Sequence, residues 1–207
     1  MLISKKYRFL FIHIFKTGGT SVTSALLPFC TNRWPRRVKS FLKRHNILWL
    51  DPQPFFKHAK ASELVAQLGR EVFDSYFSFA FVRNPWDWQV SLYTYIRKEV
   101  DHYQHRLVNG FRDFDEFIRW RCREARHYQR DFIYSADGEQ LVDFVGRFER
   151  LEEDFQTICA RLGVCVLLPK LNVSNTKPYQ EYYNKETIEL VRRKFQSDID
   201  AFGYAFE

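Results

Sequence analysis

The sequence lacks the features that mark membrane-spanning and exported proteins. No run in its 207 residues approaches the roughly 18 to 20 uninterrupted apolar residues of a membrane span. The apolar run at residues 9–14 leads into Lys16 and two glycines, with no small-residue cleavage site of an exported leader. We therefore expect a cytoplasmic protein without a transmembrane segment.

Cysteine is also scarce, and its four positions match no metal-ligand spacing: Cys30, Cys122, Cys159 and Cys165. Cys159 and Cys165 stand in apolar stretches, where a reduced cysteine behaves as a small hydrophobe. The sequence thus predicts reduced structural thiols, as in a reducing compartment, and no metal site.

Internal repeats, low-complexity tracts and domain linkers are absent too, so we expect residues 1–207 to form one domain. The chain has 32 basic and 25 acidic residues, and its net charge of +7 favours an anionic partner without identifying one. Nucleic acid, anionic lipid, an anionic nucleotide and an acidic glycan all fit that charge.

Two nearly continuous apolar runs are present, at Tyr7–Ile14 and Tyr76–Val82. Runs of this kind are typical of strands buried on both faces, as in a parallel sheet. A glycine turn follows the first run, with Thr20 or Ser21 able to cap a helix, and Asn84-Pro85 follows the second as a helix start. The repeated order of strand, turn and helix predicts an α/β fold with a mostly parallel central sheet flanked by helices.

Further elements follow from local patterns. Asp113 with Glu116 indicates a helix start, and Asp137-Gly138 indicates a hairpin or tight strand connection. Apolar residues at helical spacing predict helices around residues 62–68, from 151 to 162, and from about 184 to 202.

The segment most informative about chemistry is Phe15–Ser21, between the first strand and its helix. Backbone N–H groups at such a turn, the positive end of the helix dipole, hydroxyl groups and Lys16 together form an anion cradle. Because Lys16 precedes Gly18 and Gly19, this is not the GxxxxGK[ST] loop of P-loop kinases. A plain glycine turn with an incidental lysine is the alternative.

A second polar segment follows the other strand. Arg83 is expected at the carboxyl edge of the sheet, where open α/β folds bind ligands. Ser91 lies about two helical turns into the next helix, on the same face as Asn84. An arginine and a hydroxyl so placed form a possible phosphate site. Trp86 either contacts a base of a nucleotide there or belongs to the core.

Together these segments resemble the carbohydrate group of sulfotransferases that use 3'-phosphoadenosine 5'-phosphosulfate (PAPS), which includes bacterial members and Golgi 4-O-sulfotransferases. Residues 13–21 resemble the family's HIPKTGGTS loop, and residues 83–91 resemble RNPWDRxxS. Residues 145–155, and the tail with Lys177-Pro178-Tyr179, match as well. The chain departs from the pattern at Phe15, Trp88 and Lys170, where proline, arginine and histidine are usual.

The resemblance implies a P-loop-like sulfotransferase fold, PAPS as co-substrate without a metal, and transfer to a hydroxyl of a glycan or glycolipid. By the same resemblance, Arg83 and Ser91 bind the 3'-phosphate. The 5'-phosphosulfate is expected on six consecutive residues: Lys16, Thr17, Gly18, Gly19, Thr20 and Ser21. The basic segment from Arg33 to Arg44 is expected to contact the acceptor, with solvated surface as its alternative.

Catalysis then needs two groups. Lys16 is expected to stabilise charge on the leaving oxygen. A general base must take the acceptor's proton, and His58 is the first candidate, since related enzymes place a histidine shortly before the strand that leads to the 3'-phosphate motif. His13 is the rival, and Glu149 a third possibility for which ion pairing is the simpler role.

Two other classes of function stay open at this stage. A nucleotide kinase with an atypical phosphate loop would need ATP and magnesium. A basic nucleic-acid-binding domain fits the charge and the 18% aromatic content, but the aromatics stand mostly in apolar runs rather than among exposed basic residues. We therefore do not expect nucleic acid as a partner.

Overall fold

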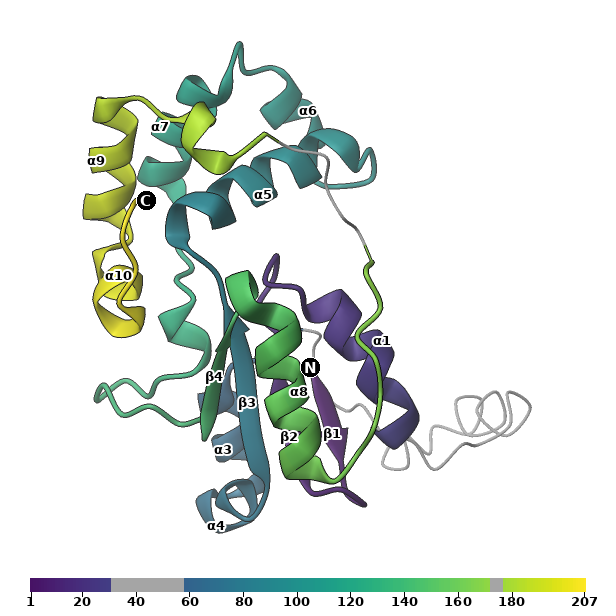
Figure 1. Ribbon diagram of the computed structural model, residues 1–207. Coiled ribbons are helices and arrows are strands. Elements are labelled where there is room, and N and C mark those ends of the chain that lie inside the picture. Colours follow the sequence, from purple (N-terminus) through teal and green to yellow (C-terminus); the bar gives the residue numbers. More distant parts are fainter. Residues whose placement is uncertain (31–57, 172–176) are drawn as a thin grey trace, which may run out of the picture. The chain divides into compact units, whose positions relative to one another are not determined.

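The computed structural model describes residues 1–30, 58–171 and 177–207 (Figure 1). The basic segment from Arg33 to Arg44, predicted to contact the acceptor, lies outside these residues. Close contacts divide the chain into two compact units, residues 1–81 with 132–171 and residues 82–131 with 172–207. The expectation of one domain stays a prediction.

A four-stranded sheet forms the centre of the first unit, in the order β1-β2-β3-β4. Its strands are β1 (Leu2–Ser4), β2 (Phe9–Ile12), β3 (Phe77–Val82) and β4 (Phe144–Arg147). β1 is antiparallel to β2, whereas β2 is parallel to β3, with Phe9 opposite Phe77. All four residues of β2 are buried, which confirms the strand predicted from the apolar run.

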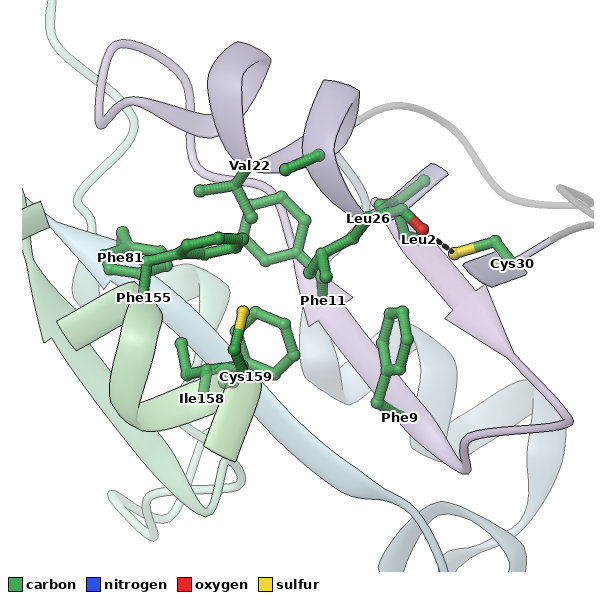
Figure 2. Packing of buried hydrophobic residues seen from close by; sticks show 12 residues of the cluster. Leu2, Phe9, Phe11, Val22, Leu26, Cys30, Phe81, Phe155, Ile158 and Cys159 are labelled. Atoms are coloured by element: carbon green, nitrogen blue, oxygen red, sulfur yellow. Dashed lines mark hydrogen bonds between the residues drawn. The ribbon is translucent and has the colours of Figure 1, made fainter. Parts of the chain in front are cut away.

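Helices flank this sheet: α1 (Gly19–Cys30), α3 (Ala61–Leu68), α4 (Arg70–Asp74) and α8 (Leu151–Leu162). α1 and α8 cover one face, and Figure 2 shows their side chains packed on the sheet. Phe11 and Phe81 of the strands meet Val22 of α1 and Phe155 of α8 in this cluster. The fold class is thus the predicted α/β arrangement, with a mostly parallel sheet flanked by helices.

The second unit is helical. Its α-helices are α5 (Pro85–Lys98), α6 (His105–Asn109), α7 (Phe114–Glu124), α9 (Lys185–Lys194) and α10 (Gln196–Phe202), and η4 (Tyr179–Tyr182) is a 3₁₀ turn. α5 contacts α6, α7, α9 and η4. The predicted caps are present, because the Asn84 side chain accepts from Trp86 N–H and that of Asp113 accepts from Glu116 N–H. Of two further 3₁₀ turns, η2 (Arg130–Phe132) spans the point where the chain passes from the second unit to the first, and η3 (Phe148–Arg150) lies in the first unit.

The predicted helix at 184–202 is wrong in one respect, since it divides at Phe195 into α9 and α10. Phe195 is fully buried against the rings of Trp88 and Tyr128, with centroids 6.0 and 5.8 Å away. The backbone of Phe195, with a φ of −107° and a ψ of 25°, departs from helical geometry at this point. Similarly, α1 begins at Gly19 rather than after a cap at Thr20 or Ser21.

The strand connection around Asp137-Gly138 is a tight turn, closed by a bond from Ser135 N–H to the carbonyl of Glu139. Only the single bridge between Tyr134 and Gln140 extends it, so a hairpin of two full strands does not form there.

The expectation for the cysteines is partly wrong, because Cys165 is exposed while Cys30 and Cys159 are buried. After α8 the chain is extended, and its partly buried apolar side chains, among them Val164 and Val166, alternate with exposed residues such as Leu167. A period of two thus turns Cys165 outward in an apolar stretch. Burial raises the pKa of the Cys30 thiol to about 12 and that of Cys122 to about 11.

Candidate functional site

The loop between β2 and α1 has an unusual backbone. Lys16 has a φ of 64° and Gly18 a φ of 81°, so both occupy the left-handed region. The Gly18 carbonyl accepts from the N–H groups of Ser21 and Val22 and closes the first turn of α1. Within the described residues, the N–H groups of Gly18, Gly19 and Thr20 have no acceptor. Unsatisfied amides at a helix start attract anions.

The loop hydroxyls differ in what they do. Thr17 is buried, and its Oγ1 donates to the carbonyl of Ile14 at 2.9 Å. Ser21 is buried as well, and its Oγ accepts from Leu171 N–H at 3.3 Å. Thr20 is exposed. Two of the three predicted ligand hydroxyls therefore fix the shape of the loop.

Gly19 is needed for a reason that sequence reasoning missed. A Cβ built on Gly19 would lie 2.1 Å from Cδ2 of His13, which is closer than any real contact. His13 is 4% exposed, and its ring stacks on Phe11 with centroids 5.6 Å apart. Gly19 thus leaves space for a buried imidazole.

His58 lies beside the same loop and is exposed. Its Nδ1 lies 2.8 Å from the main-chain oxygen of His13, and the two rings meet edge to face at 4.8 Å. A carbonyl oxygen only accepts, so Nδ1 must donate the proton of this bond. In the neutral ring the lone pair then lies on Nε2.

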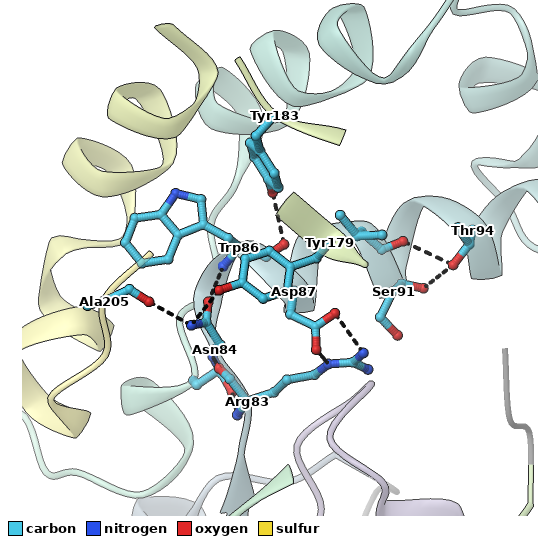
Figure 3. Close-up of polar contacts among 11 residues, drawn as sticks. Arg83, Asn84, Trp86, Asp87, Ser91, Thr94, Tyr179, Tyr183 and Ala205 are labelled. Carbon is cyan, nitrogen blue, oxygen red and sulfur yellow. Dashed lines mark hydrogen bonds and ion pairs between the residues drawn. The ribbon is translucent and has the colours of Figure 1, made fainter. Parts of the chain in front are cut away.

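In the second unit, the Arg83 guanidinium is held by Asp87 one helical turn later (Figure 3). Its Nε donates to Oδ2 at 2.7 Å and its Nη2 to Oδ1 at 2.9 Å. Arg83 and Asp87 side chains are only 11% and 21% exposed. Asp87 was missed by sequence reasoning, although its spacing of four residues from Arg83 on a predicted helix start was a usable signal.

Next to this pair, Trp86 is fully buried, and its Nε1 donates to the carbonyl of Ile188 at 3.1 Å. Its ring meets that of Phe206 edge to face. Trp86 is therefore a core residue, the plainer of the two roles that the sequence allowed. Ser91 lies farther along α5 and is 8% exposed.

The structure places the predicted residues in two groups. Lys16, His13 and His58 lie around one loop of the first unit, together with Thr17 to Ser21. Arg83 and Ser91 belong to the second unit, at the start of α5 and two turns into it. Glu149 is exposed in η3, and its neighbour Arg150 pairs with Asp154 at 3.6 Å.

The described residues contain no group of three or more His, Cys, Asp or Glu side chains placed to hold a metal ion. In the same part of the chain, no helix combines the length and apolarity needed to cross a membrane.

Comparison with known proteins adds two findings. An uncharacterized protein of Archaeoglobus fulgidus is 30% identical over 98 residues, which cover 47% of this chain and 77% of that protein. A family model described as the sulfotransferase family matches residues 1–205. That match spans the loop after β2, the start of α5 and the helices that follow. The chain belongs to the sulfotransferase family.

Proposed function

We propose that this sulfotransferase moves a sulfuryl group from PAPS to a hydroxyl of a carbohydrate or glycoconjugate. The observation that carries the donor half is the loop after β2, where three N–H groups lack an acceptor within the described residues. Lys16 stands in the same loop, so amides and a cation suited to a phosphate or sulfate group occur together. The glycan acceptor is supported by the resemblance to carbohydrate sulfotransferases.

In this proposal the loop from Lys16 to Ser21 binds the 5'-phosphosulfate of PAPS. Gly18, Gly19 and Thr20 contribute their N–H groups, and Thr17 contributes through its bond to Ile14, which holds the loop. Arg83 and Ser91 bind the 3'-phosphate, with Asp87 orienting the guanidinium. When bound, PAPS supplies an activated sulfuryl group on a phosphate leaving group.

The protein's own groups then have two tasks. Lys16 stabilises the negative charge that grows on the leaving oxygen, as preorganised cations do in phosphoryl transfer. His58 takes the proton of the acceptor hydroxyl at Nε2, while the bond from Nδ1 to the carbonyl of His13 holds the ring in the required tautomer. His13 is buried and acts here as the support of His58 rather than as the base.

Thermal unfolding with nucleotides tests the donor site. Adenosine 3',5'-bisphosphate should raise the Tm in the presence of EDTA, because a ligand that binds only the folded state stabilises it by mass action. AMP, which lacks the 3'-phosphate, should raise the Tm less at the same concentration. Equal shifts with both nucleotides would remove the role of Arg83 and Ser91, and a shift seen only with magnesium and ATP would support a kinase instead.

Turnover tests the rest of the proposal. The protein is incubated with PAPS and a panel of glycans, glycolipids and simple alcohols, and products heavier by one sulfuryl group are detected by mass spectrometry. Sulfation of a glycan is the expected result. Sulfation of a simple alcohol alone would retain the transferase and overturn the carbohydrate acceptor. The cytoplasmic location expected from the sequence stays a prediction.

A further inference from the structure

Hydrogen bonds hold the backbone of Arg83 as well as its side chain. The side-chain amide of Gln129 makes two hydrogen bonds to it, with Oε1 accepting from Arg83 N–H and Nε2 donating to the Arg83 carbonyl, each at 2.8 Å. In a sheet, a neighbouring strand makes this pair of bonds. Here β3 has ended at Val82, and one buried side chain takes the place of a strand.

Gln129 is in turn held by a carboxylate. Its N–H donates to Oδ2 of Asp198 at 3.0 Å, and the N–H of Arg130 donates to Oδ1 at 2.9 Å. Asp198 lies in the first turn of α10 and is fully buried. Hydrogen bonds thus run without a break from Asp198 through Gln129 to Arg83.

Buried polar groups lower the stability of the folded protein unless each of them makes its hydrogen bonds. Burying an amide or a carboxylate destabilises the folded protein when its hydrogen bonds are lost. Apolar side chains would fill the same space at lower cost. A buried series of hydrogen bonds that ends at the backbone of Arg83 therefore indicates that the protein holds Arg83 in a defined position.

We propose that Gln129 and Asp198 are positioning residues of the donor site, which fix the main chain of Arg83 so that its guanidinium meets the 3'-phosphate. The inference rests on the proposed function, because it takes Arg83 as the 3'-phosphate ligand. With the Gln129 bonds at the main chain and the Asp87 fork at the guanidinium, both ends of the Arg83 side chain are fixed. Displacement of a fixed group by even 1 Å is costly at a binding site.

The test separates this role from a merely structural one. The readout is the ratio of the Kd for AMP to the Kd for adenosine 3',5'-bisphosphate, which measures the contribution of the 3'-phosphate alone. Gln129→Met keeps the length of the side chain and removes both bonds. We expect the ratio to fall about tenfold or more, while the Kd for AMP changes less than about twofold.

Asp143→Asn is the matched control. The Asp143 carboxylate also holds the main chain of β3, since its Oδ2 accepts from Ser78 N–H at 2.7 Å, but it does so at the other end of the strand. This variant should leave the ratio unchanged even if it lowers the Tm. In an Arg83→Met background, Gln129→Met should change the ratio no further, because the residue it positions is gone.

Asp198→Asn supplies a second variant should Gln129→Met fail to fold. Its amide retains one acceptor oxygen for two N–H donors, so we expect a smaller fall of about threefold. Unchanged ratios in the folded variants would overturn the inference alone, provided that the wild type prefers the 3'-phosphate and Arg83→Met loses that preference. A wild type without the preference would instead overturn the donor site, and this inference with it.

Discussion

The imidazole of His58 donates from Nδ1 to the main-chain oxygen of His13, 2.8 Å away. One histidine thereby sets the tautomer of another through its backbone rather than through its ring. Because the acceptor is the main-chain oxygen of His13, replacing the His13 ring keeps this acceptor, whereas replacing the His58 ring removes the donor.

The first prediction concerns His58→Ala. If His58 is the base, kcat should fall by roughly 10²-fold or more. Nucleotide affinity should stay within about threefold, because the base contacts the acceptor and not the nucleotide. The acidic limb of the pH–rate profile should disappear in the variant, because the group whose protonation blocks proton uptake is removed. Steady-state kinetics between pH 5 and 9 measure both effects.

His105→Ala is the matched control, since its Nδ1 also lies 2.9 Å from a main-chain oxygen, that of Ile96, but within the second unit. It should retain wild-type kcat. Loss of kcat in His13→Ala or Glu149→Gln, with wild-type kcat in His58→Ala, would show that the base is assigned to the wrong residue.

The second prediction separates the backbone of Lys16 from its ammonium group. A residue other than glycine at a φ of 64° pays about 1 kcal/mol or more for the left-handed conformation. Lys16→Ala and Lys16→Gly both remove the ammonium and should both weaken nucleotide binding and lower kcat. Lys16→Gly should nevertheless unfold about 2–4 °C higher than Lys16→Ala, because only glycine removes the backbone cost. Equal Tm values would mean that the loop does not retain this conformation in solution.

The third prediction concerns the close contact between Gly19 and the ring of His13. Gly19→Ala brings a methyl group against the His13 ring, so we expect a loss of about 1–3 kcal/mol in the free energy of unfolding. Adding His13→Ala should restore part of that loss, which makes the two substitutions non-additive. Gly110→Ala serves as the control, since its φ is −76° and its new Cβ would lie 3.3 Å from the nearest atom. Additive effects in the double variant, measured by denaturant unfolding, would contradict the packing of His13 under Gly19.

The fourth prediction follows from the buried carboxyl of Asp198, whose pKa is raised to about 6 by desolvation, while the N–H groups of Arg130 and Gln129 act in the opposite direction. Nearby Asp131 raises the pKa further and the Arg130 charge lowers it. Because the folded protein binds this proton more tightly than the unfolded chain, the stabilisation is full below about pH 4 and is lost as the pH rises through about 6.

Asp198→Asn has no proton to lose at this position. The free energy of unfolding of the wild type should therefore fall relative to that of the variant, by on the order of 2 kcal/mol between pH 4 and pH 7. Urea titrations of both proteins at several pH values measure the difference. A difference that stays constant with pH would show that Asp198 keeps an ordinary pKa in the folded protein.

β2, β3 and most of the longer helices were predictable from sequence because their signals are local. The apolar runs at Tyr7–Ile14 and Tyr76–Val82 contain β2 and β3, and α8 matches its predicted bounds. β1 was missed because it is only three residues long and has no pattern of its own. The break at Phe195 was missed because no glycine or proline marks it, and Phe195 continues the apolar spacing of Ile188 and Val191.

The candidate site divides in the same way. Lys16 and Arg83 stand out because each follows a buried strand and precedes a helix. Gln129 gives no such signal, since it stands between two elements and acts on a residue 46 positions earlier. The role of Gly19 was also hidden, because the clash that requires glycine comes from a side chain whose direction the sequence does not state.

The amides of the loop and of Arg83 differ in a way that hydrogen-exchange spectroscopy can follow. Three loop N–H groups have no acceptor in the described residues: those of Gly18, Gly19 and Thr20. In the unliganded protein these amide hydrogens should exchange rapidly with solvent. The amide of Arg83 lies outside any strand pairing and yet should exchange slowly, because it donates to Gln129. Binding of an anion at the loop should lower the exchange rates of the three loop amides and leave that of the Arg83 amide unchanged. The exchange rates of the loop amides therefore report, residue by residue, whether the loop is occupied.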